Sequence, residues 1–314
     1  MATRQFSLFK SNRFWPLFLT HILGKLNNQL FKGTLILGGF AIGLTKTDSE
    51  LMPFTVLVAS LFILPFFLFS ATGGQLADKY EKPHLVQRLK AFELTTVILL
   101  SFGLVFSNYY ILLAASFLLV TQTALFTPLK YSLLPEQIEE KALIGGNGLL
   151  EAGAYGTVLF VALFTAATPS VFPAAEVTAF AMTLIAALGL WAAYKVPPAS
   201  AAVPDLKLNP NIFAETLSLF KIARKREVTF LTILGIGWFW FVATVFLSQF
   251  PSYAQNTLRA DGQVIALFLI IFASGISIGA LLCNLLLRGL ITARYVPLAA
   301  IFMALFCLDL YNIS

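Results

Sequence analysis

A run of polar side chains interrupts the first long apolar segment of the chain, residues 14–44. The run reads "HILGKLNNQLFKG" and holds two lysines, two asparagines and a glutamine. Five of its side chains recur at helical spacing and would form one stripe: His21, Lys25, Asn28, Gln29 and Lys32. An ionised lysine near the middle of a bilayer costs at least ~2.5–3.5 kcal/mol, so two of them predict a water-filled cavity or a polar partner. The expected chemistry is reversible binding inside a central cavity; alternatively, both lysines snorkel toward opposite membrane surfaces.

A second candidate lies at the end of the fourth apolar segment. Lys130 occurs in "TPLKYSLLPE", where Pro128 and Pro135 predict a break in the helix. The simpler interpretation of Lys130 is a lysine among lipid headgroups at the membrane surface.

The fifth apolar segment contains an amide and an acid. Asn147 and Glu151, in "GGNGLLEAG", are one helical turn apart and share a face. An acid buried in a membrane normally needs a cation, so Lys130 or Lys32 is expected to pair with Glu151. Glu93, early in the third segment, is expected to pair with nearby loop bases. The glycines predict close helix contacts and not a phosphate loop, because no Gly-Lys-Ser/Thr follows them.

Signatures of catalysis are missing from the sequence. It has no Gly-x-Ser-x-Gly elbow, no His-x-x-x-x-Asp arrangement and no Walker motif. His21 and His84 are its only histidines, and the spacing of Cys283 and Cys307 matches neither a zinc site nor a disulfide framework. We therefore expect no enzymatic activity, no cofactor and no metal.

The elements that position these residues follow from composition. Of 314 residues, 58% are hydrophobic and 11% charged, with a mean hydropathy of +0.84, which is typical of polytopic membrane proteins. A membrane span must satisfy its own backbone hydrogen bonds, so the predicted fold class is an all-α polytopic membrane protein. Runs of about 20 apolar residues predict about nine transmembrane helices: 14–44, 51–73, 88–107, 109–133, 143–167, 177–195, 228–252, 263–287 and 295–311.

Basic residues indicate the orientation of these helices. Nearly all of the 21 lysines and arginines fall on one side if the N-terminus is cytoplasmic, and the far side holds only Lys46 and Arg259. The same bias accounts for the net charge of +6 without a nucleic-acid partner.

Three parts are expected along the chain. Residues 1–196 form a six-helix transmembrane bundle, residues 197–227 a cytoplasmic linker, and residues 228–314 a partial C-terminal bundle. In the linker, "FAETLSLFKIARKRE" combines helical apolar spacing with a basic end, which predicts an interfacial helix. A faint repeat, "GGQLAD" in the first half and "GALLCN" in the second, favours a plan of two bundles.

The segment "GGQLADKYEKPHLVQR" after the second span resembles the loop signature of the major facilitator superfamily. The shared pattern is a glycine, an apolar residue, an aspartate and then basic residues. The resemblance implies two helical bundles that open a central cavity alternately to each side. It also implies a gating role for five residues: Gly74, Asp78, Lys79, Lys82 and Arg88.

Four other segments are similar to the lysophospholipid transporter branch of that superfamily: "TPLKYSLLPE", "GGNGLLEAG", "GWFWFVATVFLSQFPSYA" and "LCNLLLRG". In bacteria, such a membrane domain begins fusions with a lysophospholipid acyltransferase and an acyl-carrier-protein (acyl-ACP) synthetase. The resemblance implies transport of lysophospholipids across the inner membrane for reacylation, with membrane lipid and a fused or separate acyltransferase and synthetase as partners. The substrate-binding residues it implies are Lys25, Asn28, Lys32, Lys130, Asn147 and Glu151, the lysines for phosphate and the glutamate for an ethanolamine ammonium.

The chain departs from that family pattern at several positions. Asn28 stands where the first span usually has an acid, Lys25 where a small residue is usual, and Asn284 where the second half usually has an acid. Without the first-span acid, a proton-coupled cycle through that position is impossible, which favours a facilitated or lipid-gradient-driven mechanism. The superfamily normally has twelve spans, so a chain with about nine spans is expected to have an incomplete second bundle and to be truncated.

Three alternatives to lysophospholipid transport stay open. The chain would be a facilitator for a small polar solute, the membrane anchor of a fused acyltransferase, or an inactive fragment. Competition between lysophospholipid and a candidate solute would distinguish the first alternative from lysophospholipid transport. Lipid-transfer and acylation assays on separated domains would distinguish the second.

Overall fold

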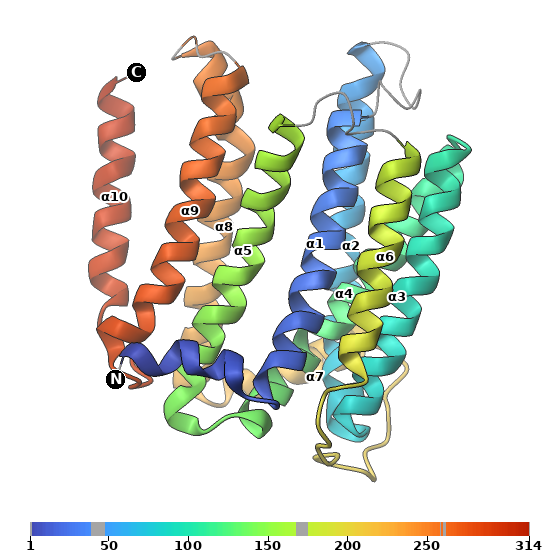
Figure 1. Ribbon diagram of the computed structural model, residues 1–314. Coiled ribbons are helices and arrows are strands. Elements are labelled where there is room, and N and C mark those ends of the chain that lie inside the picture. The colour runs from blue at the N-terminus through green and yellow to red at the C-terminus, as the bar shows by residue number, and fades with distance from the viewer. Residues whose placement is uncertain (1, 39–47, 168–174, 258, 260–261, 314) are drawn as a thin grey trace.

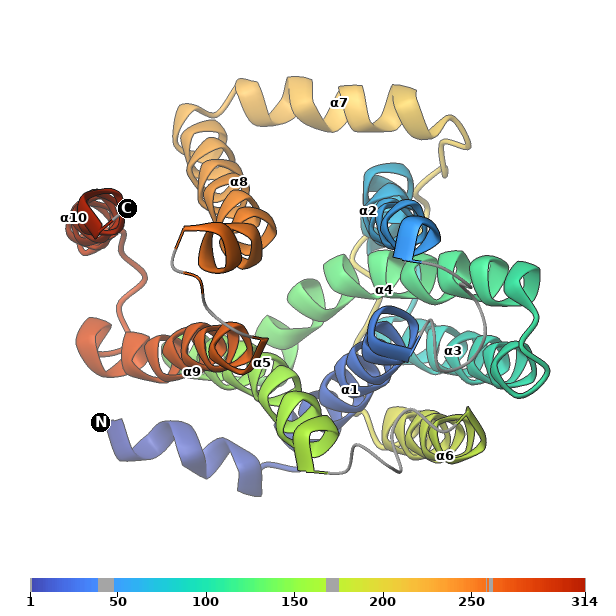
Figure 2. The same cartoon turned by 90° about the horizontal axis from the view of Figure 1, so that it is seen from above.

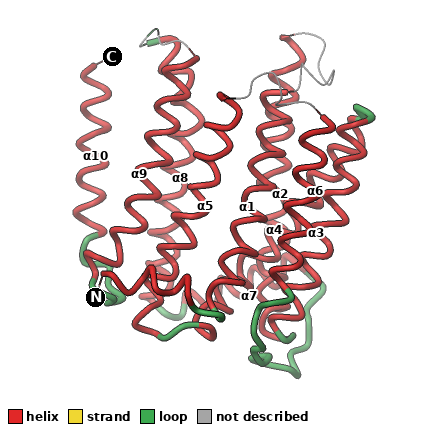
Figure 3. Tube along the Cα trace, in the orientation of Figure 1, coloured by secondary structure: helices red, strands yellow, loops and turns green. Residues whose placement is uncertain are grey.

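The computed structural model describes residues 2–38, 48–167, 175–257, 259 and 262–313, and every element within these ranges is helical (Figure 1, Figure 3). The all-helical fold class is thereby confirmed. The elements are η1 (Ala2–Lys10), α1 (Phe14–Gly38), α2 (Asp48–Lys79), α3 (Lys82–Val105), α4 (Tyr109–Gln137), η2 (Glu140–Ala142), α5 (Leu143–Ala167), α6 (Ala175–Ala193), α7 (Ile212–Arg224), α8 (Glu227–Asn256), α9 (Gly262–Leu287) and α10 (Val296–Ile313).

Within the described residues, six helices are long and apolar enough to cross a membrane, namely α2, α4, α5, α6, α8 and α9. The other three predicted spans are also helical, as α1, α3 and α10. They differ in composition: α1 carries the polar stripe, α3 begins with a basic turn, and the apolar stretch of α10 is short. The number of nine crossings therefore stays a prediction.

The first six helices pack into one group, which Figure 2 shows end-on. In this group α2 packs on α4, α3 on α4 and α6, and α1 on α5 and α6. Two buried apolar clusters fill the contacts. One is centred on Phe31, Leu100 and Leu119, and the other on Phe14, Leu129 and Leu150.

The second half of the chain is more loosely attached. α9 packs along α5, whereas α8 makes few contacts with α9, and α10 stands apart at the edge in both views (Figure 1, Figure 2). Most described side chains of α8 and nearly all of those of α10 are exposed. Apolar helices with exposed side chains face lipid or further protein in a membrane. The incompleteness of the second bundle stays a prediction.

The linker between the two halves is fastened to the first group of helices. The Gln75 side chain accepts a hydrogen bond from the Asn209 amide at 2.8 Å, and the Asp78 carbonyl accepts one from the Val203 amide at 2.8 Å. Asn211 then caps α7, which lies crosswise to the long helices between α2 and α8 (Figure 2). The expected linker helix is present, and its position at the membrane surface stays a prediction.

The predicted break in α4 is wrong. The helix runs without interruption from Tyr109 to Gln137 and contains both Pro128 and Pro135. Pro128 packs against α2, where a Cβ on Gly73 would lie only 2.8 Å from its ring. Prolines are tolerated inside membrane helices because neighbouring helices support them, and the close approach of α2 provides such support here.

Candidate functional site

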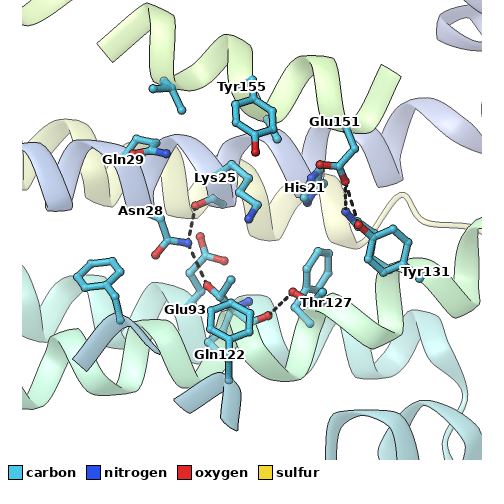
Figure 4. Close-up of a pocket in the computed structure, with 18 of the residues that line it drawn as sticks. His21, Lys25, Asn28, Gln29, Glu93, Gln122, Thr127, Tyr131, Glu151 and Tyr155 are labelled. Carbon is cyan, nitrogen blue, oxygen red and sulfur yellow. Dashed lines mark hydrogen bonds and ion pairs between the residues drawn. The ribbon is translucent and has the colours of Figure 1, made fainter. Parts of the chain in front are cut away.

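A cavity of about 1030 Å³ lies between the first group of helices and α8 (Figure 4). Its polar side chains come from α1, α3, α4 and α5. Its apolar wall comes mainly from α2 and α8, with Phe62, Ile63 and Phe66 on α2 and Ile236 and Trp240 on α8. The cavity is therefore amphipathic, with a charged side and an apolar side.

Four of the five residues of the α1 stripe line this cavity: His21, Lys25, Asn28 and Gln29. The predicted cavity-facing stripe thus exists. Lys32 is the exception. Its side chain is exposed, and its ammonium lies 5.7 Å from the centroid of the Phe62 ring in a cation–π contact. Lys32 itself is not part of the cavity lining, although Phe62, whose ring its ammonium contacts, is.

The candidate acid of α5 is paired with α4. Lys130 Nζ lies 3.1 Å from Glu151 Oε1, and the Tyr131 hydroxyl donates to the same oxygen at 3.0 Å. The Lys130 ammonium also lies 4.1 Å from the centroid of the Tyr131 ring. The expectation that Lys130 or Lys32 pairs with Glu151 is confirmed, and the partner is Lys130.

Burial of this pair is unequal. The Lys130 side chain is 4% exposed, whereas that of Glu151 is 35% exposed. A cation held out of water at this level depends on its counter-ion. Glu151 keeps a second hydrogen bond from Tyr131 and faces the cavity (Figure 4). The interpretation of Lys130 as a headgroup-level surface lysine does not fit this burial.

A second ion pair lies in the wall of the cavity. Lys90 and Glu93, one turn apart on α3, have side chains 1% and 2% exposed, and their charged atoms lie 2.6 Å apart. Asn27 donates to Glu93 at 3.5 Å, and the Lys90 ammonium lies 5.4 Å from the Phe126 ring centroid. The expected pairing of Glu93 with a base is confirmed, and it occurs inside the helix bundle, not in a loop.

The Asn28 side chain is engaged as a hydrogen-bond donor. Its amide donates to the Gly24 carbonyl at 3.1 Å and to the Thr123 hydroxyl at 3.0 Å. Asn28 thus ties α1 to α4 at the cavity wall. A carboxylate could not make the contact with the Gly24 carbonyl, since it has no N–H to donate.

Lys25 differs from the other cavity lysines. It projects into the space between α1, α4 and α5 (Figure 4). With the residues that the structure describes, it forms no hydrogen bond or ion pair.

Two buried donors nearby are also unsatisfied in the described part of the chain: Nε2 of His21 and Nε2 of Gln122. Buried polar atoms are normally paired, so these two unpartnered nitrogens are unusual, although both lie beneath the cavity surface.

Asn147 does not line the cavity. It lies on α5 near the tight contact with α9, where a Cβ on Gly148 would lie 2.5 Å from the Ala280 carbonyl oxygen. This contact confirms close helix packing around one glycine of the motif. A substrate role for Asn147 stays a prediction.

The five predicted gating residues are distributed over two helices. Gly74, Asp78 and Lys79 belong to the last turns of α2, which continues to Lys79, so the loop before α3 is only two residues long. Lys82 is buried and pairs with Glu136 of α4, and it also donates to the linker at Ser200. Arg88 is exposed on α3. Their gating role stays a prediction.

Sequence reasoning missed part of the cavity. Gln122 and Thr123 are polar residues in the middle of an apolar helix, and this is itself a signal of a functional interior face. Tyr155 follows Glu151 by one turn on the same helix, so helical periodicity would have found it. Trp240 could not be found in this way, because only the packing of α8 across the cavity brings it there.

One comparison with known proteins supplies a classification. The family model described as Major Facilitator Superfamily matches residues 8–313. The match extends from η1 to the end of α10 and so includes every helix that lines the cavity. No curated protein matches the sequence.

Proposed function

We propose a lysophospholipid as the cargo of this chain, which belongs to the major facilitator superfamily and is a multi-pass membrane transporter. In this proposal the protein lies in the bacterial inner membrane with its N-terminus in the cytoplasm. It moves lysophospholipids inward for reacylation by a fused or separate acyltransferase and acyl-ACP synthetase.

The observation that carries the proposal is the amphipathic lining of the cavity. A lysophospholipid has one charged headgroup and one acyl chain, and the cavity has charged groups on α1, α4 and α5 opposite apolar rings on α2 and α8. Its volume, about 1030 Å³, is at the upper end of small-molecule sites. A small polar solute would leave the aromatic wall without a partner.

The headgroup would be recognised by charge-assisted hydrogen bonds. Lys25 and Lys130 are the candidate phosphate ligands, and Glu151 is the candidate ligand for an ammonium. Lys32 is not retained in this role, because its ammonium lies over Phe62 and its side chain does not line the cavity.

Alternating access would proceed by movement of α8 and α9 against the first six helices. α8 closes the cavity with Ile236 and Trp240, and α9 is joined to α5 at Gly148 and Ala280. A protonation cycle at position 28 has no acid to use, since Asn28 donates two hydrogen bonds there. We therefore propose transport driven by the lipid gradient.

The experiment is lipid transfer by the purified chain in proteoliposomes. Labelled lysophosphatidylglycerol and labelled lysophosphatidylethanolamine are added outside in separate assays, and the fraction of each lipid that albumin can no longer extract measures inward movement. Wild type should protect the lipid faster than empty liposomes, and Lys130→Ala and Glu151→Ala should each abolish the difference. Lys32→Ala is the matched control and should retain transfer. Unchanged transfer in both cavity variants would refute the site, and transfer no faster than in empty liposomes would refute the cargo.

A further inference from the structure

The charges that face the cavity do not cancel. Its lining contains three lysines, Lys25, Lys90 and Lys130, and two glutamates, Glu93 and Glu151. Both glutamates already have a lysine within ion-pair distance, at 2.6 Å and 3.1 Å. One positive charge remains, and it is that of Lys25.

Among the described residues, no acid lies within ion-pair distance of the Lys25 ammonium, and the nearby carboxylate of Glu151 is already paired with Lys130. The Lys90 and Glu93 pair is almost entirely buried, and Lys130 is held by Glu151. An ammonium without an ion-pair partner, in a cavity with an apolar wall, attracts an anion more strongly than one in bulk water, because less solvent screens it. The lining therefore favours a ligand that brings a net negative charge.

Two buried donors flank the same space. His21 is one turn before Lys25 on the same face of α1, and Gln122 lies on α4 across from it (Figure 4). The side chains are 4% and 2% exposed, and Nε2 of each has no hydrogen-bond partner in the part of the chain that is described. Nε2 of Gln122 is a donor and Nε2 of His21 is one in one neutral tautomer, so an anion reached by rotation of either side chain would satisfy a nitrogen that is otherwise buried without a partner.

We propose that Lys25 is the anion-binding residue of the cavity and that, resting on the function proposed above, the cavity selects lysophospholipids with a net negative headgroup. Lysophosphatidylglycerol, with one phosphodiester charge and a neutral glycerol, meets this requirement. Lysophosphatidylethanolamine does not, because its ammonium cancels the phosphate charge. A zwitterion would also bring its ammonium close to Lys25.

Equilibrium binding to the full chain in nanodiscs of neutral lipid tests the proposal. The two lysophospholipids carry the same acyl chain, and binding to empty nanodiscs is subtracted. Wild type should prefer lysophosphatidylglycerol by about tenfold. Lys25→Gln should weaken the binding of lysophosphatidylglycerol by about 10- to 100-fold, which is the range for a lost hydrogen bond to a charged group. The affinity for lysophosphatidylethanolamine should change by less than about threefold.

Two further variants separate charge from structure. Lys25→Arg keeps the cation and should retain the preference. Lys32→Gln removes a lysine of the same helix that does not line the cavity, and it should bind both lipids as wild type does.

A third probe, dodecyl phosphate, separates this proposal from the proposed cargo. Binding of both lysophospholipids equally, with no effect of Lys25→Gln, would overturn the charge selection and leave lysophospholipid transport standing. Binding of dodecyl phosphate that depends on Lys25, without binding of either lysophospholipid, would refute the cargo and support the anion site. No binding of any probe would overturn both.

Discussion

Removing one partner of the Lys130 and Glu151 pair should have an asymmetric effect on stability. Glu151→Gln leaves the Lys130 ammonium, 4% exposed, without a counter-ion. Lys130→Gln leaves a carboxylate that is 35% exposed and still accepts from Tyr131. The first variant should therefore cost more free energy of unfolding than the second.

The magnitudes follow from the burial of the group left behind. An unpaired buried charge costs about 3–5 kcal/mol, and the amide oxygen introduced by Glu151→Gln still accepts from Lys130, which reduces the expected cost of this variant to about 2–3 kcal/mol. For Lys130→Gln the remaining carboxylate reaches the cavity, so the expected cost is about 1 kcal/mol. The double variant should cost less than the sum of the two by about 1 kcal/mol, since residues in contact are not additive.

Unfolding of the purified chain in mixed micelles by denaturant measures these differences, with Lys32→Gln as a control for the loss of a lysine outside the cavity. Exchanging the two residues, as Lys130→Glu with Glu151→Lys, should recover part of the loss, because opposite charges again face each other. Equal costs for the two single variants, or strict additivity in the double variant, would refute the assigned pairing.

The same unfolding measurement checks two other contacts. Gly148→Val should destabilise the protein by about 1–3 kcal/mol, because its new Cβ would lie 2.5 Å from the backbone oxygen of Ala280. The control Gly156→Val, where a Cβ meets nothing within 4 Å, should cost less free energy of unfolding. Equal losses in the two variants would contradict the packing of α5 on α9. Lys90→Met should cost about 3–5 kcal/mol by leaving Glu93 buried and charged, and adding Glu93→Met should recover most of it; no recovery would mean that the two side chains do not depend on each other.

Periodicity in the sequence located the cavity face but not its limits. Spacing along a helix decides which side chains share a face, and His21, Lys25, Asn28 and Gln29 do line the cavity. It does not say where along the helix the cavity ends, and Lys32 falls beyond that point. The pairing of Glu151 was open for the same reason, since only the packing of α4 beside α5 places Lys130 within reach.

Local sequence signals were less reliable where packing supports an unusual residue. Pro128 and Pro135 suggested a helix break, yet α4 is continuous, and α2 lies against Pro128 at Gly73. The glycine and aspartate signature suggested a loop, yet α2 continues to Lys79. In both cases the helix is held by a neighbour that is distant in sequence, and a local pattern contains no information about that neighbour.

The ion pair at Glu151 and the free charge at Lys25 together bear on headgroup choice. An ammonium that binds Glu151 must compete with Lys130, whose buried side chain has no other described counter-ion. Binding a zwitterion through this acid would therefore weaken a pair that stabilises the contact between α4 and α5. An anion can bind at Lys25 without disturbing either ion pair. The two lipids should consequently differ in what they do to the protein as well as in affinity, and only the zwitterion should loosen the contact between α4 and α5.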